Sequence, residues 1–295
     1  MIRKGFSMLG TGLLYLVSLL PFFILYRIAD VLFVLLYYVT GYRRKVVQQN
    51  LRNAFPEKSD AERKSIEKKY FLHLADLFVE TIKLRSISEK ELNKHFATDG
   101  FNEVVGAAFA RGKSVIGVVG HYGNWEMGSM LFSLLTHKKR IVVYKPLSNP
   151  DFDDYFKRMR SRFGNTLIPM KSIMRKLVEY RNELTVCILA ADQTPSRSEI
   201  NYFTNFLNQP TAVFLGVEKL ARLTDSAVVF GDIRRIRRGH YHCQWVPLFD
   251  NAKTTTEYEI TNAHVQYLEN VIKNDPPYWL WSHRRWKFKP EDMNK

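Results

Sequence analysis

The sequence predicts an α/β fold, a mixed, largely parallel sheet flanked by helices, preceded by an N-terminal hydrophobic membrane-anchoring segment. Apolar β-branched runs alternate with helical patterns along most of the chain, an order typical of a largely parallel sheet. One of these runs, at 114–119, is bounded by glycines, as buried strands are. The first 45 residues are instead strongly apolar. We therefore expect an anchor over residues 1–45 and an α/β domain over residues 46–295.

The anchor prediction rests on residues 5–26, which carry no charged side chain and are numerous enough to cross a bilayer. Basic clusters flank the apolar region on both sides, so charge asymmetry does not decide whether it spans the membrane or lies in the interface. A cleaved signal peptide is disfavoured, because the run is long, Pro21 interrupts it and no small-residue cleavage site follows. The alternative to membrane attachment is a hydrophobic hairpin buried in the fold.

The composition favours a polyanionic partner. Lysine and arginine number 44 against 29 acidic residues, which leaves a net charge of +15 over 295 residues. Such an excess is typical of proteins that bind nucleic acid, an anionic membrane surface or a phosphorylated substrate. Cys187 and Cys243 both lie in apolar, strand-like runs, which favours buried thiols and a reducing compartment over a disulfide.

The remaining elements follow from local patterns. Ser59 and Glu62 form a capping box, so an amphipathic helix should run to about Leu84, with His73 and Asp76 on its polar face. Further helices are expected over residues 101–111, 125–135, 153–163, 173–180, 211–222 and 258–272, and further strands over 140–144, 166–168, 184–190, 227–236 and 241–248.

The junction after the strand at 114–119 carries the main candidate site. His121 follows the strand, and Asn124 is placed to cap a helix that begins at Trp125, with Glu126 in its first turn. On one continuous helix His121 and Glu126 would lie about 140° apart, so they can meet only if His121 stays on the loop. A histidine paired with a carboxylate at the carboxyl end of a sheet is a candidate general base. The alternative is a capped helix with a surface histidine and glutamate.

Other polar groups gather at predicted strand ends and on one helix. Asp192 follows directly on the strand at 184–190, so it can converge with His121, although a simple turn residue is the alternative. The basic helix at 153–162 faces either a phosphate or solvent. The aromatic stretch at 202–206 lines an apolar channel or belongs to the core.

Two basic segments also fit a membrane surface. The arginines at 234–238 are typical of a solvated hairpin turn but also suit an anionic membrane. The segment WLWSHRRWKFK at 279–289 interleaves aromatic rings with cations, and such segments suit a membrane interface.

Several common catalytic signatures are missing. The sequence has no Gly-x-Ser-x-Gly elbow, so a serine acyl-enzyme is not supported. It has neither a Walker loop nor a paired Cys-x-x-Cys, and His121 and Glu126 lack an evident third ligand. We therefore expect no metal and no bound cofactor.

The motifs together resemble a known family. HYGNWE at 121–126 matches the His-x4-Glu signature of the lysophospholipid acyltransferase superfamily. The longer set resembles its lipid A lauroyl/myristoyl acyltransferase branch, and the apolar N-terminal segment is similar to that family's membrane anchor. The further matching blocks are Tyr144-Lys145-Pro146 with Asn149-Pro150, Arg160 and Arg162 ahead of Gly164, Asp192-Gln193, and WLWSHRRWK at 279–287.

The resemblance implies an acyltransferase domain on the cytoplasmic face of the cell inner membrane. It would move a fatty acyl group from a thioester of acyl carrier protein or coenzyme A to a hydroxyl of a glycolipid, a lipid A precursor. His121 would deprotonate the hydroxyl, and Glu126 would hold the imidazole tautomer and stabilise its cation. Arg162 or Arg160 would bind phosphate or the oxyanion, and Asp192 would shape the acceptor site. The substrate-binding residues implied are thus Arg162, Arg160, Asp192, Gln193, Lys145 and Asn149.

Three alternatives remain open at this point. The acceptor can be another membrane lipid, such as an aminolipid or a phosphatidylinositol mannoside, because the motifs do not read it. A hydrolase would use the same base and pass the acyl group to water. A non-catalytic basic protein at a membrane surface or on nucleic acid fits the composition, but the His121 junction and the apolar start argue against nucleic acid.

Overall fold

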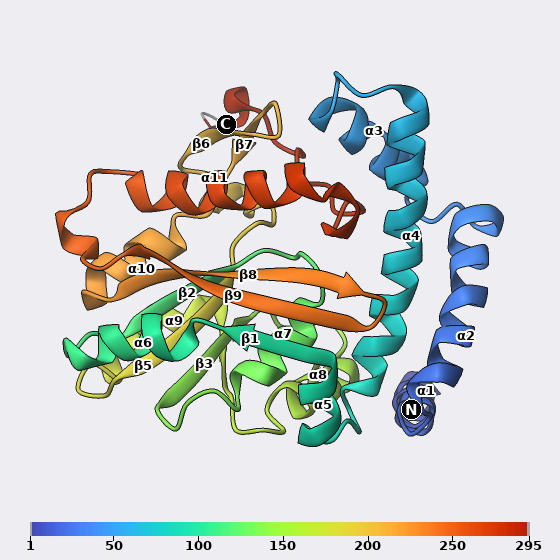
Figure 1. Ribbon diagram of the computed structural model, residues 1–295, viewed down its shortest axis with the longest axis horizontal. Coiled ribbons are helices and arrows are strands. Elements are labelled where there is room, and N and C mark those ends of the chain that lie inside the picture. Colours follow the sequence, from blue (N-terminus) through green and yellow to red (C-terminus); the bar gives the residue numbers. More distant parts are fainter. Residues whose placement is uncertain (1, 294–295) are drawn as a thin grey trace.

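The computed structural model describes residues 2–293, which form a sheet with helices on both faces (Figure 1). The helices are α1 (Ile2–Ser18), α2 (Phe22–Val34) with a π-helical continuation (Leu35–Val39), α3 (Arg44–Ala54), α4 (Asp60–Lys83), α5 (Glu89–His95), α6 (Phe101–Ala110), α7 (Trp125–Phe132), α8 (Pro150–Arg160), α9 (Ile173–Glu179), α10 (Gly216–Thr224) and α11 (Glu259–Asn274). The strands are β1 (Phe96–Asp99), β2 (Val115–Val119), β3 (Lys139–Tyr144), β4 (Thr166–Pro169), β5 (Thr185–Ala190), β6 (Phe203–Phe206), β7 (Gln209–Ala212), β8 (Ala227–Arg237) and β9 (His240–Phe249).

The main sheet has seven strands in the order β1-β9-β8-β2-β5-β3-β4. All neighbouring pairs are parallel except the β8–β9 hairpin, which confirms the predicted mixed, largely parallel sheet. Because β8, β2, β5, β3 and β4 run in one direction, their carboxyl ends lie along one edge of the sheet. In α/β proteins this edge is where ligands bind.

The side chains of the central strands alternate between two hydrophobic cores, as the pleat requires. Ile116 and Val118 of β2 belong to the core that α9, α10 and α11 cover. Val115, from the same strand, belongs to the other core, which α5, α6, α7 and α8 cover. Both faces of the sheet are therefore buried, which explains why β2 and β5 are continuous apolar runs rather than alternating ones.

One predicted helix in the middle of the chain begins later than expected. The helix expected over 211–222 begins only at Gly216, because Thr211 and Ala212 pair with the aromatic stretch in the separate two-stranded sheet of β6 and β7. Phe206 at the end of β6 is 2% exposed, so its ring belongs to the core. Strand β1 was not predicted, since four residues at the edge of a sheet give too short a pattern.

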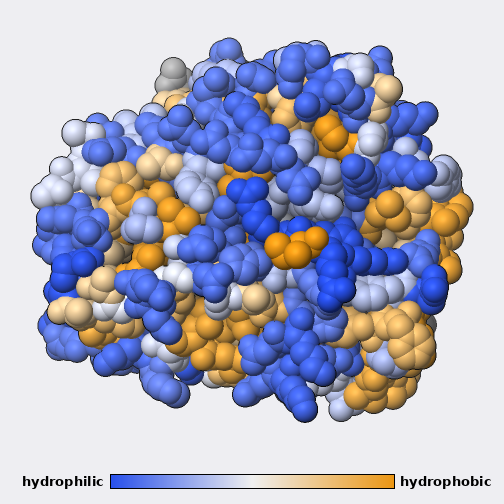
Figure 2. Space-filling view, viewed as in Figure 1, coloured by the Kyte–Doolittle hydropathy of each residue, from blue (hydrophilic) through white to orange (hydrophobic). Residues whose placement is uncertain are grey.

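The N-terminal apolar run is not one continuous helix. Pro21 separates α1 from α2, and the one helix of the described chain that is long and apolar enough to cross a membrane covers Phe22–Val39. One face of α2 is buried against α4, with Leu25 and Ala29 at 0% exposure. The opposite face leaves large apolar side chains exposed, and Figure 2 shows such residues gathered over α1 and α2 along the right edge of the molecule.

Helix α4 begins at the predicted capping box, since the Ser59 and Glu62 side chains each bond the other's backbone nitrogen. The prediction that His73 and Asp76 occupy its polar face is wrong, because the two side chains are 1% and 2% exposed. The helix is covered by α2 on one side and by the sheet edge and the hairpin on the other, so it has little solvated surface in its second half (Figure 1).

The central side chains of the C-terminal aromatic segment are buried in the fold rather than presented to a membrane. Trp279 and Trp281 are 2% and 0% exposed, and Arg285 is 3% exposed. Backbone hydrogen bonds from Gly123 to the Tyr278 carbonyl and from Leu280 to the His121 carbonyl attach this segment to the loop after β2. Trp279, Trp281 and Arg285 therefore support the candidate site from within the fold, whereas the cations Arg284, Lys287 and Lys289 are exposed.

Candidate active site

The candidate site lies where two neighbouring parallel strands end. Val119 of β2 and Ala190 of β5 are paired in register. His121 and Asp192 each follow two positions later, so both side chains emerge at the same height of the sheet edge. The predicted convergence of these two strand ends is confirmed.

His121 and Asp192 form a close pair. Nδ1 of His121 lies 2.5 Å from Oδ1 of Asp192, and the backbone nitrogen of His121 donates to Oδ2 over 2.9 Å. Nε2 of His121 lies 3.1 Å from the side-chain amide nitrogen of Gln193. An Nδ1–H donated to the carboxylate leaves Nε2 as an acceptor for the amide N–H, so this network fixes the tautomer with a basic Nε2. The His121 side chain is 15% exposed, so a ligand can reach it.

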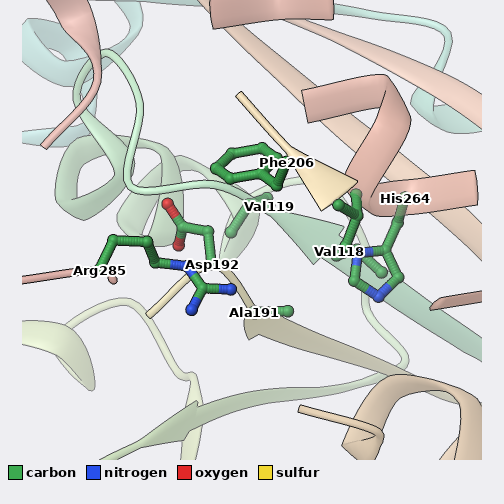
Figure 3. Close-up of a pocket in the computed structure, with 8 residues that line it drawn as sticks. Val118, Val119, Ala191, Asp192, Phe206, His264 and Arg285 are labelled. Atoms are coloured by element: carbon green, nitrogen blue, oxygen red, sulfur yellow. The ribbon is translucent and has the colours of Figure 1, made fainter. Parts of the chain in front are cut away.

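Asp192 is held by more than the histidine. The indole nitrogen of Trp279 donates to Oδ2 of Asp192 over 2.7 Å. Figure 3 shows Asp192 beside Arg285 at a small cavity that Phe206 and His264 also line. The cavity volume is about 10 Å³, which is room for about one water molecule. The cavity is therefore too small for an acyl chain.

The charges of this pair shift both pKa values in favour of an ion pair. Burial opposes charge on His121, but the charge and hydrogen bond of Asp192, together with the charge of Glu126, outweigh it and raise the pKa of His121. Burial likewise opposes charge on Asp192, but His121 and the Trp279 hydrogen bond lower the pKa of Asp192 to about 2. Asp192 is thus a carboxylate at neutral pH, and its negative charge stabilises the imidazolium form of His121.

Glu126 does not orient the imidazole, contrary to the sequence prediction. The guanidinium of Arg160 donates two hydrogen bonds to its carboxylate, from Nε to Oε2 over 2.8 Å and from Nη2 to Oε1 over 2.5 Å. Both partners are largely buried, at 14% and 20% side-chain exposure. The bidentate geometry fixes both groups near the imidazole, while the hydrogen bond predicted for Glu126 is made by Asp192.

The start of α7 fixes the position of Glu126 relative to the loop that carries His121. Gly123 has φ of +59°, a left-handed conformation that turns the loop sharply between His121 and the helix. Asn124 then caps α7 by accepting from the Met127 nitrogen over 2.8 Å, as predicted. The amide of Asn124 donates to the buried Glu80 of α4 over 2.7 Å, so the helix start is fixed from the far side of the loop.

The structure places the other predicted residues in different settings. Arg162 donates to the Leu84 carbonyl over 2.7 Å and so connects the end of α8 to α4. Asn149 caps α8 by accepting from the Asp151 and Phe152 nitrogens. Lys145 is exposed in the loop before that helix. Of the predicted basic groups, Arg160 alone is bonded to a residue of the HYGNWE loop and helix start within the described part of the chain.

Some residues of the site were missed at the sequence level. Trp279 bonds Asp192 from 87 residues away in the sequence, and Glu80 bonds Asn124 from 44 residues away. No local sequence pattern predicts contacts of this kind. Among the described residues, no group of three or more histidine, cysteine, aspartate or glutamate side chains is placed to hold a metal ion.

A family model described as bacterial lipid A biosynthesis acyltransferase matches residues 1–288 of the chain. The chain belongs to that family. The protein is accordingly an acyltransferase, and the resemblance seen in the HYGNWE, Asp192-Gln193 and C-terminal blocks is confirmed by a match over nearly the whole chain.

Individual relatives of this acyltransferase are similar at low identity over most of their length. A lipid A biosynthesis lauroyltransferase of Escherichia coli (strain K12) is 25% identical over 99% of this chain and 94% of its own. A lipid A biosynthesis palmitoleoyltransferase of the same organism is 24% identical over 98% and 93%. A lipid A biosynthesis acyltransferase of Haemophilus influenzae is 24% identical over 85% and 79%.

Proposed function

We propose that this acyltransferase moves a fatty acyl chain from a thioester of acyl carrier protein or coenzyme A to a hydroxyl of a lipid A precursor. The observation that carries the proposal is the hydrogen-bonded chain Asp192–His121–Gln193, which leaves Nε2 of His121 as the basic atom at the carboxyl edge of the sheet. The acceptor is inferred from the family and from relatives whose names state lipid A biosynthesis.

A thioester is already an activated acyl donor, so the transfer can be direct and needs no covalent enzyme intermediate. Nε2 of His121 takes the proton of the acceptor hydroxyl as its oxygen attacks the thioester carbonyl carbon. Collapse of the tetrahedral oxyanion breaks the C–S bond, and the imidazolium returns the proton to the leaving thiolate. The products are an ester and a free thiol, so atoms and charge balance.

Asp192 has the role that the sequence assigned to Glu126. Its carboxylate keeps the proton of the neutral imidazole on Nδ1 and stabilises the imidazolium that forms during the transfer. The Gln193 amide occupies the position at Nε2 of His121 that the acceptor hydroxyl must take. The amide would therefore move aside when the acceptor binds.

The Glu126–Arg160 ion pair holds a guanidinium in a fixed position near the base. Arg160 has five N–H donors, and only those on Nε and Nη2 bond Glu126. Its remaining donors would bind the oxyanion or a phosphate of the acceptor, and Glu126 would hold the guanidinium in place. Arg162 would contribute to this region structurally, through α4.

The location proposed is the cytoplasmic face of the inner membrane, with attachment through α1 and α2. The exposed apolar residues of these helices support it, among them Leu13 at 62%, Phe23 at 70% and Val31 at 62% exposure. An acyl chain and a lipid acceptor both partition into a bilayer, so an enzyme that joins them gains by residing there.

The test of substrate identity is a transfer assay with purified enzyme in detergent micelles, read by mass spectrometry. Acyl carrier protein and coenzyme A thioesters are each offered with a lipid A precursor that has a free hydroxyl, a phosphatidylinositol mannoside or no acceptor. We expect one new acyl ester on the lipid A precursor and little free fatty acid. Acylation confined to the other lipid, or release of fatty acid without acceptor, would contradict the proposal.

A further inference from the structure

A basic cavity lies outside the His121 site, between α4 and the tip of the β8–β9 hairpin. Its volume is about 320 Å³, large enough for a phosphate headgroup. The charged residues that line it are one carboxylate and four cations: Asp76, Lys69, Arg235, Arg237 and Arg238. The lining therefore carries an excess of positive charge.

Two of the cations hold the hairpin in place. Asp76 is 2% exposed and accepts from Arg235 over 3.1 Å and from Arg238 over 2.6 Å. Removing either arginine would leave a buried carboxylate with less compensation, so both have a structural role. These bonds fix the hairpin against α4 and give the cavity a rigid wall.

The other two cations are free to bind a ligand. Lys69 on α4 and Arg237 at the hairpin tip are both exposed, and neither forms an ion pair with any side chain among residues 9–293. Between the arginines, Ile236 is 66% exposed, which is unusual for a large apolar side chain at a charged tip. Cations around one protruding apolar group form a surface suited to a lipid headgroup region.

The cavity borders the apolar face of α2. Arg238 bonds the Tyr26 carbonyl over 3.2 Å and Asp30 over 2.7 Å, both on α2. One and two helical turns further along, Val34 and Tyr38 are 46% and 59% exposed. In Figure 2 the apolar surface over α1 and α2 adjoins a strongly hydrophilic area over α4 and the hairpin. A lipid could thus place its phosphate in the cavity and its chains along α2.

We propose that this cavity binds the phosphate headgroup of an anionic phospholipid in the membrane leaflet to which the enzyme is attached. The inference rests on the proposed membrane attachment. Lys69 and Arg237 contact the headgroup, and Ile236 inserts among the chains beside it. Nucleic acid is disfavoured as the ligand because the cavity opens next to an apolar surface rather than a continuous basic one. The bound lipid fixes the hairpin, and hence the sheet edge that carries His121, at a set height above the bilayer.

The test is binding of the purified full-length protein to vesicles that contain no lipid A precursor. Vesicles of phosphatidylcholine alone are compared with vesicles that also contain phosphatidylglycerol. The variant Lys69→Glu/Arg237→Glu reverses the two free cations without touching the pairs of Asp76. The matched control Lys219→Glu/Lys253→Glu makes the same change of net charge on and beside α10, at the opposite end of the molecule (Figure 1). Thermal melts check that both proteins fold, and Lys69→Gln/Arg237→Gln is the milder substitute.

We expect phosphatidylglycerol to strengthen binding of the wild type and the control variant. In the cavity variant, the increase in affinity that phosphatidylglycerol causes should be smaller by about tenfold or more, since each basic residue near an anionic surface contributes several-fold to affinity. Its affinity for phosphatidylcholine vesicles should not change. Equal losses in the two double variants would show that net charge alone is responsible and would overturn the proposal. So would unchanged binding of the folded cavity variant. Because the vesicles hold no acceptor, neither result depends on acyl transfer.

Discussion

Nδ1 of His121 lies 2.5 Å from Oδ1 of Asp192, although 71 positions separate the two residues in the sequence. The contact follows from the sheet, because β2 and β5 are parallel neighbours whose last residues are in register. The geometry gives the imidazole a fixed tautomer and a buried counter-charge. The predictions below follow from this pair and from the groups that hold it.

Asp192→Asn should lower both activity and the pKa that governs it. The amide keeps the size but removes the charge that raises the pKa of His121, so burial then lowers that pKa. The acid limb of the pH profile of kcat should shift to lower pH, because the imidazole becomes neutral at a lower pH. The rate at the plateau should fall on the order of 10²–10⁴-fold. Asp99→Asn, which changes the exposed Asp99–His242 pair, is the control and should leave the profile unchanged.

A second prediction separates support of Asp192 from general stability. Trp279→Phe removes the indole N–H that donates to Asp192, and Trp281→Phe removes the N–H of a second buried tryptophan, which donates to the Pro276 carbonyl over 2.7 Å. Each loss should cost about 1–3 kcal/mol of unfolding free energy. Only Trp279→Phe should also reduce kcat, by about tenfold. If both variants lose kcat equally when corrected for folded protein, Trp279 has no specific role in positioning Asp192.

Arg160, the last residue of α8, and Arg162, just after it, should differ in their effects on turnover. Arg160→Lys replaces a bidentate guanidinium by a single ammonium beside Glu126, so kcat/KM should fall at least about tenfold. Arg162→Lys affects one hydrogen bond to the Leu84 carbonyl and should lower stability slightly with a small effect on turnover. Steady-state kinetics on phosphorylated and dephosphorylated acceptor measure both. A loss for Arg160→Lys that is the same on the two acceptors would assign Arg160 to the oxyanion, and equal turnover by all proteins would remove it from the site.

Membrane attachment should depend on the exposed face of α2. Val31→Glu/Val34→Glu places charge on side chains that are 62% and 46% exposed, so the fold should remain and the protein should leave the membrane fraction. Leu223→Glu/Met174→Glu, at exposed apolar positions of α10 and α9, should stay in that fraction. Fractionation at moderate salt without detergent measures the difference. Truncation is a poorer test, because α2 also buries Leu25 and Ala29 against α4.

Much of the fold could be predicted from local patterns. The glycine-bounded apolar run at 114–119 predicted β2, the apolar run at 184–190 predicted β5, and the Ser59 capping box predicted the start of α4, because these signals depend on neighbouring residues. The edge strand β1 and the β6–β7 pair were missed, since short strands are defined by their partners rather than by their own sequence.

The site was predicted in part, for the same physical reason. The strand-end rule brought His121 and Asp192 together, but it did not say which carboxylate would bond the imidazole. That depends on the direction in which α7 leaves the loop, which Gly123, Asn124 and the buried Glu80 determine through tertiary contacts. The sequence pattern places the C-terminal tryptophans at a membrane interface, because composition does not distinguish an aromatic interface from an aromatic core. Trp279 and Arg285 are buried because they surround Asp192.

The most direct test is the rate of acyl transfer from a labelled thioester by His121→Ala and by His121→Ala/Asp192→Asn, with thermal melts to establish folding. The account predicts that His121→Ala loses on the order of 10²–10⁴-fold in kcat. It also predicts that the double variant is about as slow as the single one, because Asp192 acts through the imidazole. Near-normal transfer by a folded His121→Ala protein would contradict the account.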